Sequence, residues 1–428
     1  MRPHVRAGLS CGQVADEVRS RRRQLFADEG ACAAYLGAST ESLRKQECRK
    51  RNEGGMHPKE PARHQASRFI PDDAKLPQRF ATRQWIPVLD GEHAPKAPGH
   101  LVLQTERQRQ GALARPTAHV YMDGTFDIVA PPFKQLLTVS IRVSSTTAID
   151  GKTPHKAAPV GFALMSSMTT HDYMRVLKVL IPGALRPAVV HVDFEAALWT
   201  CARDIFGSGQ KILGCSFHMA QAVTRRACGK GELRKEYVRD PNVRKWVKCY
   251  AALPFVDAKW VLDLAESLEQ NQPSSDAEVL RKTKQFSDYS KSTWLVGNGP
   301  GFQIKSWCAY GHAERTNNRA EGFHRRLQAR CKKANGPYKL AKLLEEEAEK
   351  AVTTFDQALA NMPLVGRRDA ARDYECKIQR RWQKYEDGVK GYQQAHELMV
   401  EFANDLPVDD YGSCSLLRFA GRESKHRQ

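Results

Sequence analysis

HVYMDGTF at residues 119–126 and AVVHVDF at residues 188–194 are the two stretches that decide how this sequence folds. Each begins with β-branched and other apolar residues and then reaches an aspartate, Asp123 in the first and Asp193 in the second. Short apolar runs of this kind are typical of strands buried inside a sheet. The sequence therefore predicts two buried strands, each of which ends in a carboxylate.

The segments around these two strands alternate between strand-like and helix-like patterns. HVYMDGTF, KQLLTVSIRVS and VGFALMSS follow one another as three strands, which we expect to form an antiparallel meander. Helix and strand then alternate through the segments 171–185, 188–194, 195–207, 211–218 and 219–229. The order strand-strand-strand-helix-strand-helix-strand-helix predicts an α/β fold with a mixed sheet, and it resembles a ribonuclease H-like fold.

The remaining chain divides into further parts by pattern. Residues 1–100 are basic and weakly patterned, which favours short helices and loops, and we interpret them as a remnant of a DNA-binding region. The α/β domain covers 101–335 and contains a helical insertion at about 233–300, before a final helix that begins near Asn317. Residues 336–428 form a helical C-terminal region, which either serves an interface between subunits or packs within the chain.

Charge and composition narrow the class of partner and the compartment. The formal net charge of +19 favours an anionic polymer, with nucleic acid as the first interpretation and a generally basic protein as the second. No apolar run is long enough to span a bilayer, so we expect no membrane partner. The start of the chain lacks a secretory core and the 11 cysteines are scattered, which favours a reducing compartment inside the cell. Arg21–Arg23 fit a nuclear signal or a solvated helix face.

Three carboxylates are the candidate catalytic residues: Asp123, Asp193 and Glu321. In a ribonuclease H-like sheet the strands that carry the two aspartates are neighbours, so their side chains converge. Neighbouring carboxylates repel unless a cation joins them, and hard oxygen ligands suit two Mg²⁺ or Mn²⁺ ions that promote phosphoryl transfer. Each acid alone fits a turn, a cap or a solvated helix face, whereas the ordered set favours catalysis.

Residues around Glu321 support this interpretation. Helical spacing predicts that Asn317, Asn318 and His324 share its face and line a polar wall. His324 would orient Glu321 or contact phosphate, or it would be a structural hydrogen-bonding residue. Positive charge gathers nearby, and we predict DNA contacts from Arg319, Arg325, Arg326, Arg330, Lys332 and Lys333.

Six blocks of this chain resemble the Mutator-like element (MULE) transposases. They are YMDGTFDIVAPPFKQLLTVSI, VGFALMSSMTTHDYMRVLKVL, VVHVDFEAALWTCARDIFG, KILGCSFHMAQAV, ALPF and TNNRAEGFHRRL, within roughly residues 85–335. The resemblance implies a DDE-type acidic triad that falls on Asp123, Asp193 and Glu321. It also implies Mg²⁺-dependent cleavage and transfer of double-stranded DNA at terminal inverted repeats, within the nucleus and by paired subunits. Glu195 would then be a supporting acid, or it would simply favour the dipole of the helix that it opens.

Cys215 and His218 match the CxxH of that family. Their spacing suits two ligands of a structural Zn²⁺ ion, although four are needed, and Cys201 and Cys228 are the remaining candidates. The alternative is that Cys215 packs as a small apolar residue while His218 forms a hydrogen bond at the junction of strand and helix.

Three functions remain open at this point. An active DDE transposase is the first, and a domesticated, non-catalytic DNA-binding or regulatory protein derived from one is the second. The second is favoured by the ends of the chain, where the cysteines and histidines show no zinc-module spacing. A ribonuclease H-like nuclease that cuts RNA in hybrids is the third.

Overall fold

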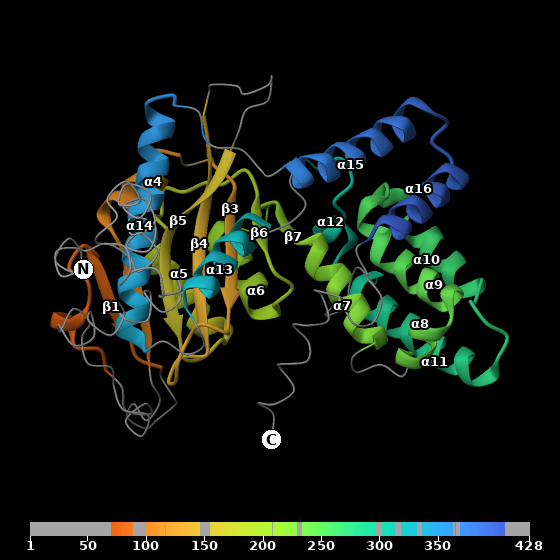
Figure 1. The fold of residues 1–428 in the computed structure, drawn as a ribbon, viewed down its shortest axis with the longest axis horizontal. Coiled ribbons are helices and arrows are strands. Elements are labelled where there is room, and N and C mark those ends of the chain that lie inside the picture. The colour runs from red at the N-terminus through yellow and green to blue at the C-terminus, as the bar shows by residue number, and fades with distance from the viewer. Residues whose placement is uncertain are drawn as a thin grey trace, which may run out of the picture.

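The computed structural model describes residues 70–88, 99–115, 117–145, 155–207, 209–228, 233–295, 302–312, 318–331, 336–362, 364 and 369–406, without the side chains of 217, 318–321 and 369–375. Within these ranges a mixed sheet with helices on both faces stands beside a second lobe made of helices (Figure 1). The fold is therefore mixed α/β, as the alternating pattern predicts.

The sheet has seven strands in the order β1-β2-β5-β4-β3-β6-β7. Their bounds are β1 Thr82–Ile86, β2 His100–Gln104, β3 Val120–Thr125, β4 Gln135–Ser144, β5 His155–Met165, β6 Val190–Val192 and β7 Ile212–Gly214. β3, β4 and β5 form the predicted antiparallel meander, whereas β6 pairs with β3 and β7 pairs with β6 in parallel. β3 is thus an interior strand with an antiparallel neighbour on one side and a parallel neighbour on the other.

The interpretation of residues up to 100 as short helices and loops is wrong for the end of that region. β1 pairs with β2, and β2 pairs with the edge of the meander at β5. HLVLQ is short and buried along its whole length, so it shows no alternation, and TRQWI carries polar residues on a half-exposed strand. Neither pattern separates strand from loop when it is considered alone.

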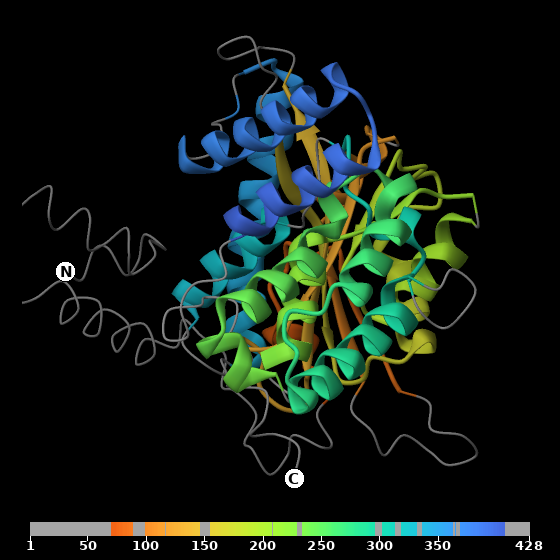
Figure 2. The same ribbon diagram turned by 90° about the vertical axis from the view of Figure 1, so that its right-hand side faces the viewer.

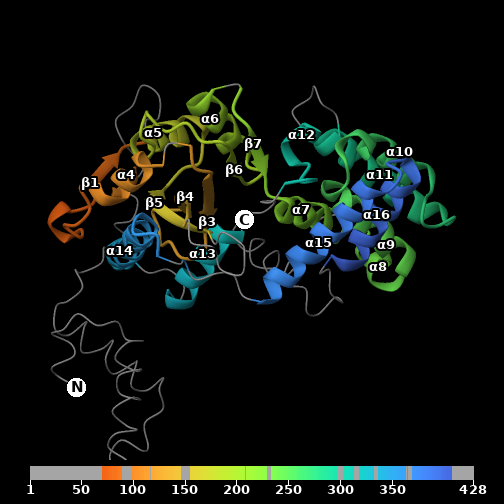
Figure 3. The ribbon, with the colours of Figure 1, turned by 90° about the horizontal axis from the view of Figure 1, so that it is seen from above.

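Helices cover the two faces of the sheet (Figure 3). α5 (Thr170–Leu180) and α6 (Ala196–Phe206) pack on one face, while α13 (Asn318–Arg330) and α14 (Pro337–Leu359) pack on the other. A further helix, α4 (Glu106–Leu113), contacts β5 and α14. The predicted apolar stripe of α5, from Tyr173 to Leu180, is buried, and a capping box at Thr169 starts that helix.

The second lobe is built from helices on both sides of α13 in the sequence (Figure 2). Its elements are α7 Ser216–Cys228, α8 Arg234–Arg239, α9 Pro241–Ala252, α10 Val261–Gln270, α11 Ala277–Ser290, a π-helical turn Lys291–Leu295, α12 Ile304–Trp307, α15 Asp369–Asp387 and α16 Tyr392–Asp405. The helical character predicted for 233–300 is confirmed for the residues described there. The helices of the C-terminal region do not form one unit, because α14 packs on the sheet while α15 and α16 join this lobe.

None of the helices in the described ranges is long and apolar enough to span a bilayer.

A buried hydrogen bond between two side chains joins β2 to α5. His100 Nε2 lies 3.0 Å from Asp172 Oδ1, and the backbone N–H of Ser166 donates to Nδ1, so Nε2 carries the proton of a neutral imidazole. Burial opposes ionisation of Asp172, but hydrogen bonds from His100, Thr169 and Ser167 outweigh it and lower its pKa to about 2. Burial also lowers the pKa of His100, against the opposing effect of Asp172.

Both groups therefore hold fewer protons in the folded chain than in the unfolded chain, so stability rises with pH. The contribution of Asp172 is complete above its ordinary pKa of 3.8 and is lost as pH falls through about 2. The contribution of His100 to stability begins to be lost as pH falls below the ordinary pKa of histidine, 6.5.

We expect His100→Gln to lower stability at pH 7.5 by about 1–3 kcal/mol, because a buried hydrogen-bonded group is lost. The same variant should reduce the fall in the thermal unfolding midpoint between pH 7.5 and pH 5.5, since its residue 100 does not titrate. His171→Gln is the control, because His171 is exposed and lies next to Asp172 in α5. An unchanged pH dependence in His100→Gln would show that other groups cause it.

Candidate carboxylate site

The pairing of β3 with β6 places two of the candidate acids side by side. Val120, Tyr121 and Met122 are in register with Val190, His191 and Val192, and Asp123 and Asp193 directly follow the last of these pairs in the sequence. Neighbouring strands lie about 5 Å apart. The carboxyl ends of two parallel strands therefore bring together carboxylates that lie 70 positions apart in the sequence.

Asp123 is buried, and it is contacted by His324 of α13, the helix that packs on this face of the sheet. Its Oδ2 lies 3.1 Å from His324 Nδ1, and Nε2 of the same ring lies 3.1 Å from Thr138 Oγ1. Thr138 is the register partner of Asp123 on β4. When the threonine hydroxyl donates to Nε2, Nδ1 carries the proton and faces the carboxylate. One imidazole thus links a helix to two adjacent strands.

Asp193 is more open, since its side chain is 40% exposed. Its Oδ1 accepts a 2.7 Å hydrogen bond from the backbone N–H of Phe194. The same oxygen lies 3.1 Å from His218 Nδ1, which is ion-pair distance without the alignment of a hydrogen bond. His218 is in the first turn of α7. The second carboxylate is therefore contacted by a histidine, as the first one is.

Phe194 anchors the segment that carries Asp193. Its ring packs against Trp199, Trp294 and Phe302, with centroids 5.9, 4.9 and 4.9 Å away. It contacts the core of the sheet domain and that of the helical lobe. At the end of β7, Gly214 makes room for the ring, because a Cβ there would overlap it. The position of the Asp193 carboxylate therefore depends on the packing of Phe194 between the two lobes.

The third candidate, Glu321, lies in α13 one turn before His324. The helix rises about 1.5 Å per residue, so the two Cα positions are about 4.5 Å apart along its axis. α13 is fixed against β3 by His324 and by Gln328, whose Nε2 donates to Thr125 Oγ1. The side chains of Asn318, Arg319 and Glu321 and all of Asn317 lie outside the described residues. The structure therefore places α13, the helix that contains Glu321, beside the aspartates, but it does not describe where the Glu321 side chain lies.

Glu195 lies on the opposite side of the strand ends from α13. Its Oε2 accepts from the hydroxyl of Tyr173 at 2.8 Å. Burial raises the pKa of Glu195, the hydrogen bond from Tyr173 opposes this, and the nearby charge of Asp193 adds to it. The side chain is therefore built into the site and does more than open α6, where it makes no capping hydrogen bond.

The sequence interpretation missed a stack of rings on the face that carries the aspartates. The rings of His119 and His191 have centroids 5.3 Å apart, and those of His191 and Tyr121 are 4.8 Å apart. His119 Nδ1 and His191 Nε2 are 3.1 Å from each other. A signal was present, since histidine occurs two or four positions before each aspartate. The rings of Tyr121 and His191 belong to residues that lie two positions before Asp123 and Asp193 on neighbouring strands.

The zinc hypothesis for Cys215 and His218 gains no additional ligand from the described residues. Cys215 is buried, and His218 contacts Asp193. The thiol of Cys201 donates to the carbonyl of Thr170 in α5. Among the described side chains, which do not include that of Glu321, no group of three or more His, Cys, Asp or Glu has the geometry of a metal site.

The predicted DNA-binding residues differ in what they contact. Arg325 and Arg326 are exposed on α13, and the guanidinium of Arg326 lies over the ring of Phe323. Arg330 instead forms ion pairs with Glu347 at 2.7 Å and with Glu346, so its charge is already compensated by α14. Lys332 and Lys333 lie outside the described residues.

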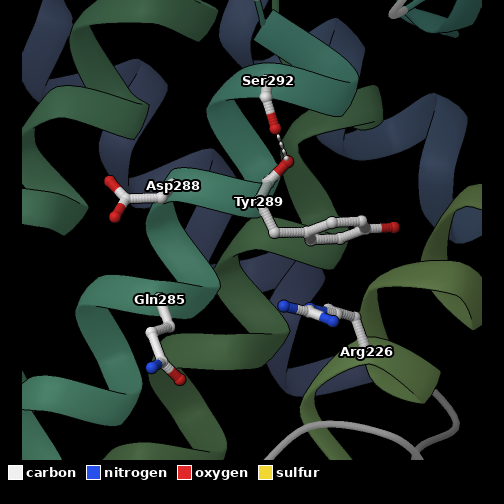
Figure 4. A pocket seen from close by; sticks show the side chains of 5 residues that line it. All are labelled: Arg226, Gln285, Asp288, Tyr289 and Ser292. Carbon is white, nitrogen blue, oxygen red and sulfur yellow. Dashed lines mark hydrogen bonds between the residues drawn. The ribbon is translucent and has the colours of Figure 1, made fainter.

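A shallow hollow lies elsewhere, on the helical lobe (Figure 4). It is lined by Arg226, Gln285, Asp288, Tyr289 and Ser292. The guanidinium of Arg226 lies 5.0 Å from the centroid of the Tyr289 ring. None of the candidate residues lines this hollow, so it is separate from the carboxylate site.

The aspartates have the donor chemistry that Mg²⁺ or Mn²⁺ prefers. Asp123 uses Oδ2 for His324, and Asp193 uses Oδ1 for Phe194 and His218. Among contacts within the described chain, the other oxygen of each carboxylate is left for a ligand. The residues present fit a divalent cation held between the two strands, with position 321 one turn away from His324.

Comparison with protein-family models found no match, and comparison with curated proteins found none either.

We expect Gly214→Ala to destabilise the protein by about 1–3 kcal/mol, because the added methyl group displaces the packed ring of Phe194. Gly183→Ala is the matched control, since nothing lies near a Cβ at that exposed position. Urea unfolding of both variants gives the comparison. Equal stability of the two would contradict the role given to Gly214.

Proposed function

We propose that this protein is a DDE-type DNA transposase of the Mutator-like kind, which cleaves and transfers DNA strands with divalent metal ions. The observation that supports the proposal is the parallel register of β3 and β6, whose last pair, Met122 and Val192, is followed on each side by one of the proposed catalytic aspartates. Asp123, Asp193 and Glu321 are the proposed catalytic and metal-binding residues.

The strand order supports a ribonuclease H-like assignment for the sheet domain. The five strands from β3 to β7 have the spatial order β5-β4-β3-β6-β7, with the antiparallel meander on one side and the parallel strands on the other. α13 contacts Asp123 through His324. β1 and β2 extend this sheet at its edge, and the helices of the predicted insertion join α15 and α16 in the helical lobe.

Two divalent cations at such a site would activate the attacking oxygen and stabilise the leaving oxygen of a phosphodiester. The chain itself would hold the carboxylates in place, through His324 on Asp123 and through Phe194 and His218 on Asp193. The openness of Asp193 gives a phosphate access from solvent.

Double-stranded DNA is the proposed partner, both at terminal inverted repeats and at the target. A net charge of +19 favours binding to a polyanion, and Arg325 and Arg326 put exposed charge on the helix that covers the site. A nuclear location and a homo-oligomer that pairs two DNA ends belong to the same proposal.

Asp193→Asn should lower nicking of a plasmid that carries the DNA flanking the coding region by more than about 100-fold. Changes to groups that only support a metal ligand typically cost up to about 100-fold, and Asp193 is proposed to bind the metal directly. DNA binding should survive, because one polar side chain replaces another of equal size. Relaxation of supercoiled plasmid in Mn²⁺ measures nicking, and gel retardation measures DNA binding.

Asp127→Asn is the control, since Asp127 is exposed and follows Asp123 by four positions. Normal nicking by Asp193→Asn would contradict the proposal. Preferential cutting of RNA–DNA hybrid over duplex DNA would instead favour a ribonuclease H-like nuclease. Duplex binding without cleavage or cation binding would favour a non-catalytic regulatory protein.

His324→Ala should lower nicking by about 10- to 100-fold, because Asp123 loses the group that orients it. His324→Asn should retain much more activity, because its amide nitrogen replaces Nδ1 as a donor. Nicking rates of the two variants test this. A variant pair with equal losses would indicate that the imidazole acts in another way.

A further inference from the structure

Tyr173 connects the interior of the sheet domain to the carboxylate site. Its ring is fully buried in α5, on the face of the sheet opposite α13. Its hydroxyl lies 2.6 Å from Gln135 Oε1 and 2.8 Å from Glu195 Oε2. Gln135 is the first residue of β4, and Glu195 immediately precedes α6. One hydroxyl therefore contacts two segments that border the aspartates.

Gln135 carries this contact to the backbone beside Asp123. Its side-chain amide lies directly over Gly124, so that a Cβ on that glycine would overlap the amide nitrogen. Gln135 is itself buried, which leaves the amide little freedom to move. The Tyr173 hydroxyl thus fixes a group that covers the residue after Asp123.

Glu195 carries the contact to Asp193. Phe194 lies between these two acids in the sequence, and its ring packs among Trp199, Trp294 and Phe302. With Phe194 held on one side and Glu195 held by Tyr173 on the other, the short segment after β6 is restrained at both residues that follow Asp193. The direction of the Asp193 carboxylate is therefore set by Phe194 and Glu195, which do not themselves face α13.

The hydrogen bonds of the three groups depend on one another. A phenol has one proton, so its hydroxyl donates either to Glu195 or to Gln135. When it donates to an ionised Glu195, the Gln135 amide satisfies the phenol oxygen by turning its NH₂ group toward it. The orientation of each group is thus determined by the other two.

We infer that Tyr173 is a positioning residue, which holds the end of β3 and the segment after β6 so that Asp123 and Asp193 bind a divalent cation together. This rests on the proposed function, and it adds a residue from the opposite face of the sheet to the supports already described. Tyr173 touches neither aspartate in the contacts above and acts through Gln135 and Glu195.

The test is Mn²⁺ binding by the full-length protein, followed by the electron paramagnetic resonance signal of free Mn²⁺. Tyr173→Phe removes the hydroxyl and keeps the buried ring. We expect it to weaken Mn²⁺ binding by at least about 10-fold, the lower end of the range for groups that support metal ligands. Plasmid nicking at low Mn²⁺ should fall in parallel and recover largely at saturating Mn²⁺.

Tyr250→Phe is the matched control. Tyr250 is also buried, and its hydroxyl lies 3.1 Å from Ser287 Oγ in the helical lobe. It should lose a comparable hydrogen bond and bind Mn²⁺ as wild type does. Unchanged Mn²⁺ binding in Tyr173→Phe, or equal weakening in both variants, would overturn the inference.

Glu195→Ala gives a second test if Tyr173→Phe does not fold. It should weaken Mn²⁺ binding by itself, and an unchanged Mn²⁺ affinity would overturn the inference. Where Tyr173→Phe folds, the double variant should bind more tightly than the product of the two single effects predicts, because both act in one network. Independent, multiplying losses would overturn the inference.

These outcomes separate the two proposals. Wild type that binds Mn²⁺ but does not nick DNA would refute the proposed function, while weaker binding in Tyr173→Phe would still support the positioning role. Wild type that nicks DNA, together with a Tyr173→Phe variant of normal Mn²⁺ affinity, would refute the positioning role alone. Wild type that binds no Mn²⁺ would overturn both.

Discussion

The in-register parallel pairing of β3 and β6 is the constraint on which the candidate site depends. Backbone hydrogen bonds fix Met122 opposite Val192, and the residue after each of them in the sequence is an aspartate. Two unit charges at about 4 Å repel by about 1 kcal/mol in water and by about 4 kcal/mol near a protein surface. The apolar halves of these strands are buried against α5 and α6, so the sheet can hold the carboxylates together at this cost.

The supports of the two aspartates come from different layers of the molecule. His324 reaches Asp123 from α13, whereas His218 reaches Asp193 from α7, which belongs to the helical lobe. Phe194 packs against both cores and is adjacent to Asp193. The surroundings of Asp193 therefore include residues of the helical lobe, whereas those of Asp123 come from the sheet and α13.

Local pattern predicted the parts of the fold where periodicity is strong. The stripe from Tyr173 to Leu180 and the apolar runs before Asp123 and Asp193 each carry their own signal. The pattern could not predict β1 and β2, because a short strand of mixed polarity gains its stability from the strands beside it. It also could not predict that Arg330 pairs with Glu346 and Glu347, since that contact depends on how α13 and α14 lie side by side. His324 was singled out for its spacing from Glu321, yet the contact that it makes is with Asp123.

The use of histidine at both aspartates has a physical rationale within the proposed site. An arginine or lysine at 3 Å would neutralise a carboxylate permanently and compete with any cation for it. An imidazole can donate one hydrogen bond while it is neutral, so it orients the carboxylate and leaves the negative charge in place. Thr138 contacts the second nitrogen of His324, and when its hydroxyl donates there, the imidazole proton is on Nδ1, which faces Asp123. The exposed arginines, by contrast, lie on α13 beyond His324, where a phosphate is free to compete for them. Charge that would bind DNA is thereby kept apart from the carboxylates that would bind metal.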